Sequence, residues 1–131
     1  MERNPINPWN WSIQFGYNQA VYVEGHTKQL LCSGQTAVDA TGAPCHAGDM
    51  RQQLALALDN MEATLHAAGM GLDKVVRLTV FSTDVDATLA NFDVLAARLG
   101  VETLRPAMSL LGVTRLALPP LLVELEATAM A

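Results

Sequence analysis

Charge is scarce in this chain, and most of it is negative. Only 16% of the 131 residues are charged, and Asp and Glu outnumber Lys and Arg by 13 to 8, giving a formal net charge of -5. The eight basic residues are scattered along the sequence rather than clustered. Contacts with nucleic-acid phosphates need clustered Lys and Arg, so we do not expect nucleic acid to be a partner.

Cysteines are few, and long apolar runs and metal-ligand patterns are missing. No apolar run approaches the roughly 20 residues that cross a bilayer, and residues 1–5 contain no apolar targeting core. We therefore expect a cytoplasmic protein with no membrane partner, in which Cys32 and Cys45 are free, reduced thiols. None of the three histidines has a ligand-like spacing to another histidine or to a cysteine. We expect no metal and no cofactor.

Apolar residues, in contrast, make up 50% of the chain, which excludes a disordered protein. A chain of 131 residues is long enough to bury one core. No internal repeat, low-complexity segment or linker divides residues 1–131, which we interpret as a single domain. Because so few surface positions are charged, we expect other subunits to cover part of the apolar surface.

Hydrophobic spacing predicts an α+β domain with two helices. Strands are expected at residues 21–23, 30–33, 75–81, 107–113 and 121–129, after an irregular segment of twenty residues. One helix is predicted over residues 49–68. A second begins near residue 86, with Leu89, Phe92, Ala96 and Leu99 as its buried stripe and Gly100 at its end. Two helices of this length cover only one face of a sheet.

The last predicted strand indicates what lies on the other face. Val123, Leu125 and Ala127 alternate with Glu124 and Glu126, so the two carboxylates project roughly 7 Å apart from the face away from the core. Carboxylates among largely apolar neighbours fit a subunit interface that encloses a polar cleft.

Five sequence blocks in a fixed order resemble the YjgF/RidA family, the reactive-intermediate deaminases, also known by the older label endoribonuclease L-PSP. The blocks are Gly16-Tyr17-Asn18-Gln19-Ala20, Ser33-Gly34-Gln35, Asp59-Asn60 with Ala68-Gly69, Val76-Arg77-Leu78-Thr79-Val80-Phe81, and Glu124-Leu125-Glu126-Ala127. The resemblance covers nearly the whole chain. It implies a chorismate-mutase-like fold, in which a mixed β-sheet carries two helices on one face. It also implies a homotrimer with a small-molecule pocket at each of its three subunit interfaces.

The same resemblance implies a set of site residues. In deaminating members an arginine holds the carboxylate of a 2-imino acid or of 2-aminoacrylate, and a glutamate orders the water that hydrolyses the C=N bond. The match makes Glu124 the candidate catalytic residue. The candidate substrate-binding residues are Tyr17, Ser33, Phe92 and Met108. Met108 follows Pro106-Ala107 where the deaminating members have the arginine, so 2-aminoacrylate is not the expected substrate.

Two neighbouring positions offer alternatives within this match. Phe92 stands where the family has a pocket asparagine, and Asn91 is one position earlier; a slip of one residue turns a helix by about 100°. Arg105 lies three residues before Met108, roughly 10 Å away and on the opposite face of an extended strand. We do not expect Arg105 to replace the missing arginine.

Structural roles are also open for several candidates. Glu124 is either a water-ordering acid or half of an interface ion pair, and Tyr17 is either a pocket residue or a packing residue with a bonded hydroxyl. Ser33 is either a pocket residue or a turn residue. Trp9 and Trp11 either cover an apolar patch, which we favour, or wall the mouth of the pocket.

Two functions follow. The first is a small-molecule hydrolase acting on C=N or enamine bonds of an unidentified substrate, which Glu124 favours. The second is a non-catalytic trimeric protein that binds a small ligand or regulates through the inter-subunit cleft, which Met108 and Phe92 favour because both make the pocket apolar. The acidic charge balance gives no support to a ribonuclease.

Overall fold

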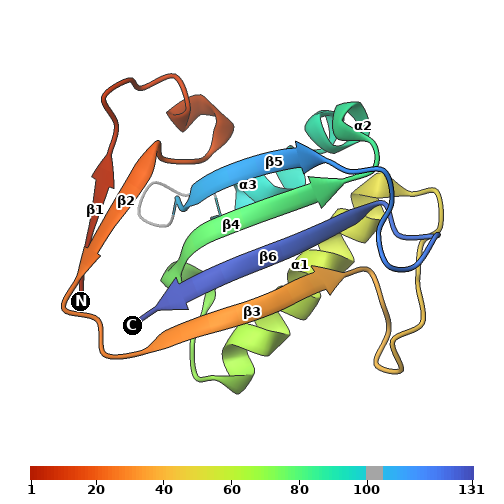
Figure 1. The fold of residues 1–131 in the computed structure, drawn as a ribbon, viewed down its shortest axis with the longest axis horizontal. Coiled ribbons are helices and arrows are strands. Elements are labelled where there is room, and N and C mark those ends of the chain that lie inside the picture. Colours follow the sequence, from red (N-terminus) through yellow and green to blue (C-terminus); the bar gives the residue numbers. More distant parts are fainter. Residues whose placement is uncertain (100–104) are drawn as a thin grey trace.

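The fold belongs to the predicted α+β class: a four-stranded mixed sheet carries its helices on one face (Figure 1). The strand predicted at residues 21–23 forms, but it lies in a separate two-stranded sheet. The computed structural model describes residues 1–99 and 105–131. The sheet has the order β3-β6-β4-β5, in which β4 and β5 are parallel and the other neighbours are antiparallel. The strands are β3 (Gln29–Thr36), β4 (Val75–Ser82), β5 (Ala107–Gly112) and β6 (Val123–Met130).

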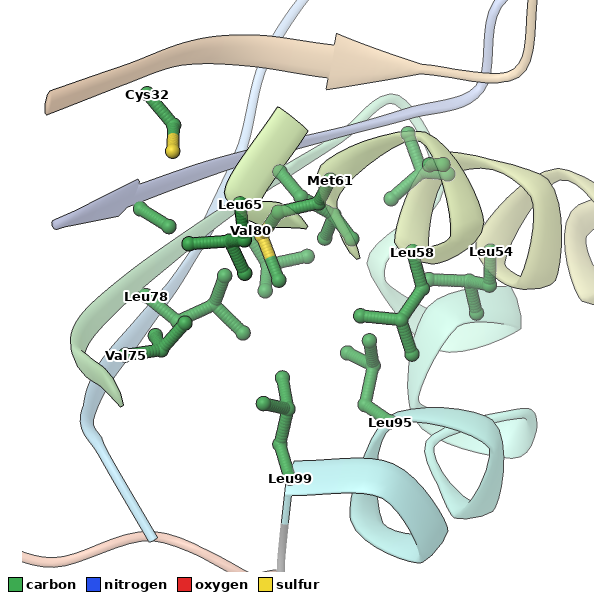
Figure 2. Close-up of a cluster of buried hydrophobic side chains, with 14 of the residues drawn as sticks. Cys32, Leu54, Leu58, Met61, Leu65, Val75, Leu78, Val80, Leu95 and Leu99 are labelled. Carbon is green, nitrogen blue, oxygen red and sulfur yellow. The ribbon is translucent and has the colours of Figure 1, made fainter. Parts of the chain in front are cut away.

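Helix α1 (Met50–Ala67) packs across β3 and β6 and supplies much of the core. Asp49 caps its first turn, because the Asp49 carboxylate accepts a hydrogen bond of 3.0 Å from the backbone N–H of Gln52. Gly69, with a φ of 73°, ends the helix in the left-handed conformation that glycine adopts without strain. The predicted apolar stripe is buried, and Figure 2 shows its side chains converging with those of β4 and a later helix. These α1 residues are Leu54, Leu58, Met61 and Leu65.

The second predicted helix is wrong as one continuous element. The chain instead forms α2 (Val85–Ala90) and α3 (Asp93–Leu99), because Asn91 leaves helical geometry and its side-chain amide donates to the Ala87 carbonyl at 2.8 Å. The break changes which side chains are buried: Leu95 and Leu99 are in the core, whereas Leu89 is 55% exposed and Phe92 is half-buried. Gly100, the predicted end, lies outside the described residues.

The N-terminal segment is more regular than predicted. Strand β1 (Glu2–Ile6) pairs antiparallel with β2 (Ala20–Glu24), and a short 3₁₀ turn, η1, covers Ile13–Phe15. The Arg3 guanidinium donates to the Asp73 carbonyl at 2.8 Å and to the Arg105 carbonyl at 3.0 Å. These long-range bonds hold β1, whose sequence has little strand propensity of its own. A second 3₁₀ turn, η2 (Leu72–Lys74), precedes β4.

The opposite face of the sheet has no helix on it in the described part of the chain (Figure 1). The predicted alternation along β6 is confirmed: Val123, Leu125 and Ala127 are buried, and Glu124 and Glu126 point to the open face. On the neighbouring strand β3, Leu31 is 73% exposed. Within residues 1–99 and 105–131, no helix combines the length and the apolar character that crossing a membrane requires.

Candidate functional site

An apolar pocket of about 500 Å³ lies at the outer edge of β5. Three separate parts of the chain form its walls: the N-terminal segment, the α2–α3 junction and β5. The lining residues are Trp11, Phe15, Tyr17, Leu89, Phe92, Met108 and Leu110. Tyr17, Phe92 and Met108, three of the five candidate site residues, are therefore brought together.

Strand pairing determines the direction of the β5 side chains. Met108 is the neighbour of Leu78, and Leu110 is the neighbour of Val80, across the parallel β4–β5 pair. Leu78 and Val80 are fully buried on the helix side of the sheet. Neighbouring residues in register point to the same face, so Met108 and Leu110 lie on the helix side, at an edge strand where they also contact the pocket.

The N-terminal wall is held in place by Asn18. Its backbone N–H donates to the Pro106 carbonyl at 3.0 Å, and its side-chain amide donates to the Arg105 carbonyl at 2.8 Å, at the start of β5. Trp11 and Tyr17 lie on either side of the η1 turn in the sequence, and their rings meet edge to face with centroids 6.3 Å apart. Trp11 thus lines the pocket, the less favoured of its two expected roles, and Trp9 does not.

The α2–α3 break positions the third wall. Because the Asn91 amide is bonded to the Ala87 carbonyl, Phe92 and not Asn91 lines the pocket. The break also leaves Leu89 facing the pocket instead of the core. The one-residue slip that would place the Asn91 amide in the pocket wall therefore does not occur.

No charged residue is among the pocket's described lining residues. The arginines of the described segments have other partners. Two of them form ion pairs with carboxylates: Arg51 with Asp93, and Arg98 with Asp59 and Glu62. Three others donate hydrogen bonds to neutral oxygens: Arg77 to the Ser109 hydroxyl, Arg115 to the carbonyls of Leu116 and Ala117, and Arg3 to the carbonyls of Asp73 and Arg105. Arg105 is not among the lining residues. Within a single chain, a carboxylate in this pocket would therefore lose water without gaining a cation.

Ser33 and Glu124, the other two candidates, lie on the open face of the sheet. A Cβ built on Gly34, the residue after Ser33, would lie 1.7 Å from the Glu124 Oε1 atom, so the carboxylate rests directly against the β3 backbone. Glu124 is half-buried, and its carboxylate forms no ion pair or hydrogen bond within the described residues. In a single chain, Glu124 and Met108 are on opposite faces of the sheet.

Four pocket residues were not among the predicted site residues: Trp11, Phe15, Leu89 and Leu110. Leu110 could have been predicted from the sequence, because it lies two residues after Met108 on a strand and so shares its face. Phe15 and Leu89 had no comparable local signal, since long-range contacts place them.

Thiol and imidazole groups form no ligand cluster in the described segments. Cys32 and Cys45 are unpaired. Cys32 is buried in the core, and this burial raises the pKa of its thiol, which disfavours the thiolate needed for nucleophilic chemistry.

Comparisons with known proteins agree on one family. The family model described as endoribonuclease L-PSP matches residues 12–131. The mitochondrial protein mmf2 of Schizosaccharomyces pombe is 38% identical over 66% of this chain, but the alignment spans only 64% of that relative's length. The RutC family protein PH0854 of Pyrococcus horikoshii is 30% identical over 95% of this chain and 88% of its own.

A comparison with solved structures indicates the same family. The crystal structure of a conserved Rid-family protein, YyfB from Yersinia pestis, matches over 100% of both chains with a TM-score of 0.86 and 34% identity. Because the family model covers most of the sequence and the structural match covers all of it, this chain belongs to the endoribonuclease L-PSP family, that is, the YjgF/RidA family.

Proposed function

We propose that this protein is a homotrimeric hydrolase of C=N or enamine bonds whose substrate has no carboxylate. The observation that carries this proposal is the pocket wall: Met108 and Phe92 line it, and no cation does. An arginine at position 108 would bind a carboxylate through charge-assisted hydrogen bonds. A methionine thioether offers only dispersion and contact with apolar or aromatic groups.

The division of the candidate residues supports an oligomeric site. Tyr17, Phe92 and Met108 lie on the helix side of the sheet, and Ser33 and Glu124 lie on the open face. The two groups meet only if the open face of one copy covers the pocket of another. The 73% exposure of Leu31 on that face supports such contact, because a large apolar side chain is unfavourable there in water. Family membership favours a trimer with one pocket at each interface.

In this arrangement Glu124 acts as the proton-transfer group. Its carboxylate takes a proton from a water molecule as the water oxygen bonds to the carbon of the C=N group, and passes this proton to the nitrogen to give a carbinolamine. The carboxylate then transfers the hydroxyl proton of the carbinolamine to the nitrogen as the C–N bond breaks, which releases ammonia and leaves a carbonyl compound. The half-buried Glu124, with no partner in the described segments, is free to serve in this way.

A second candidate function is a non-catalytic protein that binds or senses a small ligand in the same cleft. One observation favours it: Tyr17 is the only ionisable residue among the described pocket lining. If Glu124 only stabilises the subunit interface, the pocket still binds a ligand but nothing is hydrolysed.

A matched pair of imines tests the proposal. An amino-acid oxidase acting on phenylalanine generates an imine with a carboxylate, and a flavin-dependent amine oxidase acting on 2-phenylethylamine generates the corresponding imine without one. We expect the protein to accelerate loss of the second imine above its spontaneous hydrolysis and to have little effect on the first. Preference for the imino acid would contradict the proposal. Ligand binding without acceleration of either imine would favour the second candidate.

A further inference from the structure

The aromatic residues of this chain are concentrated at one place. The sequence contains 3 Phe, 2 Tyr and 2 Trp, seven in all. Four of these seven, Trp11, Phe15, Tyr17 and Phe92, line the pocket beside β5. They come from two segments far apart in the sequence, so this concentration is a product of the fold.

We propose that this pocket binds an uncharged aromatic group, so that the substrate, within the function proposed above, is the aldimine of an arylalkylamine. Aromatic rings pair favourably in edge-to-face and offset geometries. The pocket already contains one such pair, Trp11 and Tyr17, with an interplanar angle of 81°. Met108 adds a thioether, which contacts ring edges favourably.

The exposure of the wall supports an apolar occupant. Trp11, Phe15 and Leu89 are each about half exposed, at 51%, 50% and 55%, although all three line the same hollow. A ligand that enters there removes their apolar surface from water. The volume of about 500 Å³ is in the usual range for small-molecule sites and exceeds what a single aromatic ring fills.

The chemistry also indicates which reaction supplies such a substrate. A compound R–CH=NH, with R ending in an aromatic ring, is formed when a primary amine R–CH₂–NH₂ loses two electrons and two protons to an amine oxidase. Adding one water then gives R–CHO and NH₃, with the water oxygen forming the new carbonyl. The nitrogen leaves as ammonia. The hydrolytic step needs no oxidant.

Two dyes test the binding part of this proposal independently of catalysis. N-phenyl-1-naphthylamine is uncharged, and 8-anilinonaphthalene-1-sulfonate has nearly the same rings with an added sulfonate. We expect the uncharged dye to bind one per chain and the sulfonate to bind at least about tenfold more weakly, because the pocket offers no cation to the anion. Equal affinities, or no binding of the uncharged dye, would overturn the proposal.

Trp9 supplies a matched control for Trp11. Both belong to the N-terminal segment and both are exposed, at 64% and 51%, but only Trp11 lines the pocket. Trp11→Ala should weaken binding of N-phenyl-1-naphthylamine by about tenfold, the effect of losing one aromatic wall. Trp9→Ala should leave it unchanged. Equal effects of the two variants would place the dye outside the pocket and contradict the assignment.

Two further measurements separate this proposal from the function on which it rests. Glu124→Gln should lose hydrolysis but retain binding of the uncharged dye, because the aromatic wall supplies the dye's contacts and the substitution keeps the size of side chain 124. The imine of 2-phenylethylamine should be hydrolysed faster than the imine of butylamine. Dye binding with no hydrolysis of either imine would refute the hydrolase but keep the aromatic pocket. Faster hydrolysis of the butylamine imine, with no dye bound, would keep the hydrolase and refute the aromatic pocket.

Discussion

The carboxylate of Glu124 occupies the space that a side chain at Gly34 would need. A Cβ at position 34 would be 1.7 Å from Glu124 Oε1 and 2.5 Å from Cδ. Gly34 lies within the irregularity of β3 between Cys32 and Gln35, opposite β6. The missing side chain lets Glu124 lie across β3, half-buried on the open face, and so determines where this carboxylate is presented.

Gly34→Ala should therefore move the Glu124 carboxylate with little effect on the fold. The atoms that the new methyl group meets belong to the Glu124 side chain, which can rotate away. We expect a clear loss of imine hydrolysis with a nearly unchanged unfolding temperature. Gly71→Ala is the control. Its Cβ would also meet a carboxylate, 2.7 Å from Asp73 Oδ1, but at a position outside the candidate site. Equal activity in the two variants would contradict a role for the position of Glu124.

The two glutamates of β6 should differ in their contribution to activity. Glu124→Gln removes the proposed proton-transfer group and should lower the hydrolysis rate by roughly 10²-fold or more. Glu126→Gln should retain most of the rate, since Glu126 is exposed on the same face and has no assigned role in the cleft. Rates are compared after light scattering shows that both variants keep the wild-type assembly. A Glu124→Gln variant as fast as wild type would remove Glu124 from the mechanism.

The open face should be the surface through which copies associate. We expect light scattering at micromolar concentration to give the mass of a trimer. Leu31→Glu should lower the measured mass toward that of the monomer. Leu31 is 73% exposed on β3 in the single chain, so the substitution would bury a charge in the proposed interface. Ala63→Glu adds the same charge to the exposed side of α1 and should leave the trimer intact. A monomeric wild-type protein would refute the inter-subunit site.

Met108→Arg should raise activity on 2-imino acids. The new guanidinium supplies a charge-assisted hydrogen bond to the substrate carboxylate, worth roughly 1.5–3 kcal/mol, or about tenfold or more in rate or affinity. The gain is expected to be partial, because Phe92 keeps part of the wall apolar. Met108→Leu preserves size without charge and should give no gain. An unchanged preference in Met108→Arg would show that position 108 does not contact the substrate.

Acid should destabilise the protein partly through the cap of α1. Hydrogen bonds from the backbone N–H and side-chain amide of Gln52 lower the pKa of the Asp49 carboxyl. A lowered pKa in the folded state means that the stabilisation is fully present above about pH 4 and is lost as the pH falls through the folded-state value. Asp49→Asn keeps a capping side chain without this titration. Its unfolding temperature should fall less than that of wild type between pH 5 and pH 3; equal slopes would exclude Asp49 as a contributor.

Much of the fold could be predicted because it depends on local periodicity. The stripe of α1 and the alternation along β6 reflect elements buried on one face only, and such elements keep a regular spacing in the sequence. The two errors have a different origin. Strand β1 depends on the bonds from Arg3 to Asp73 and Arg105, and the α2–α3 break depends on the side chain of Asn91. Neither interaction produces a hydrophobic period.

Three properties can be read from the amino-acid sequence alone: position 108 is uncharged, Glu124 points away from the core, and the chain resembles a known family. Two others depend on how the chain folds: Met108 and Glu124 lie on opposite faces of the sheet, and four aromatic rings gather beside Met108. The reason is the range of the contacts. The parallel pairing of β5 with β4, and the bond from Asn18 to the Arg105 carbonyl 87 residues away, join segments whose proximity no local pattern encodes.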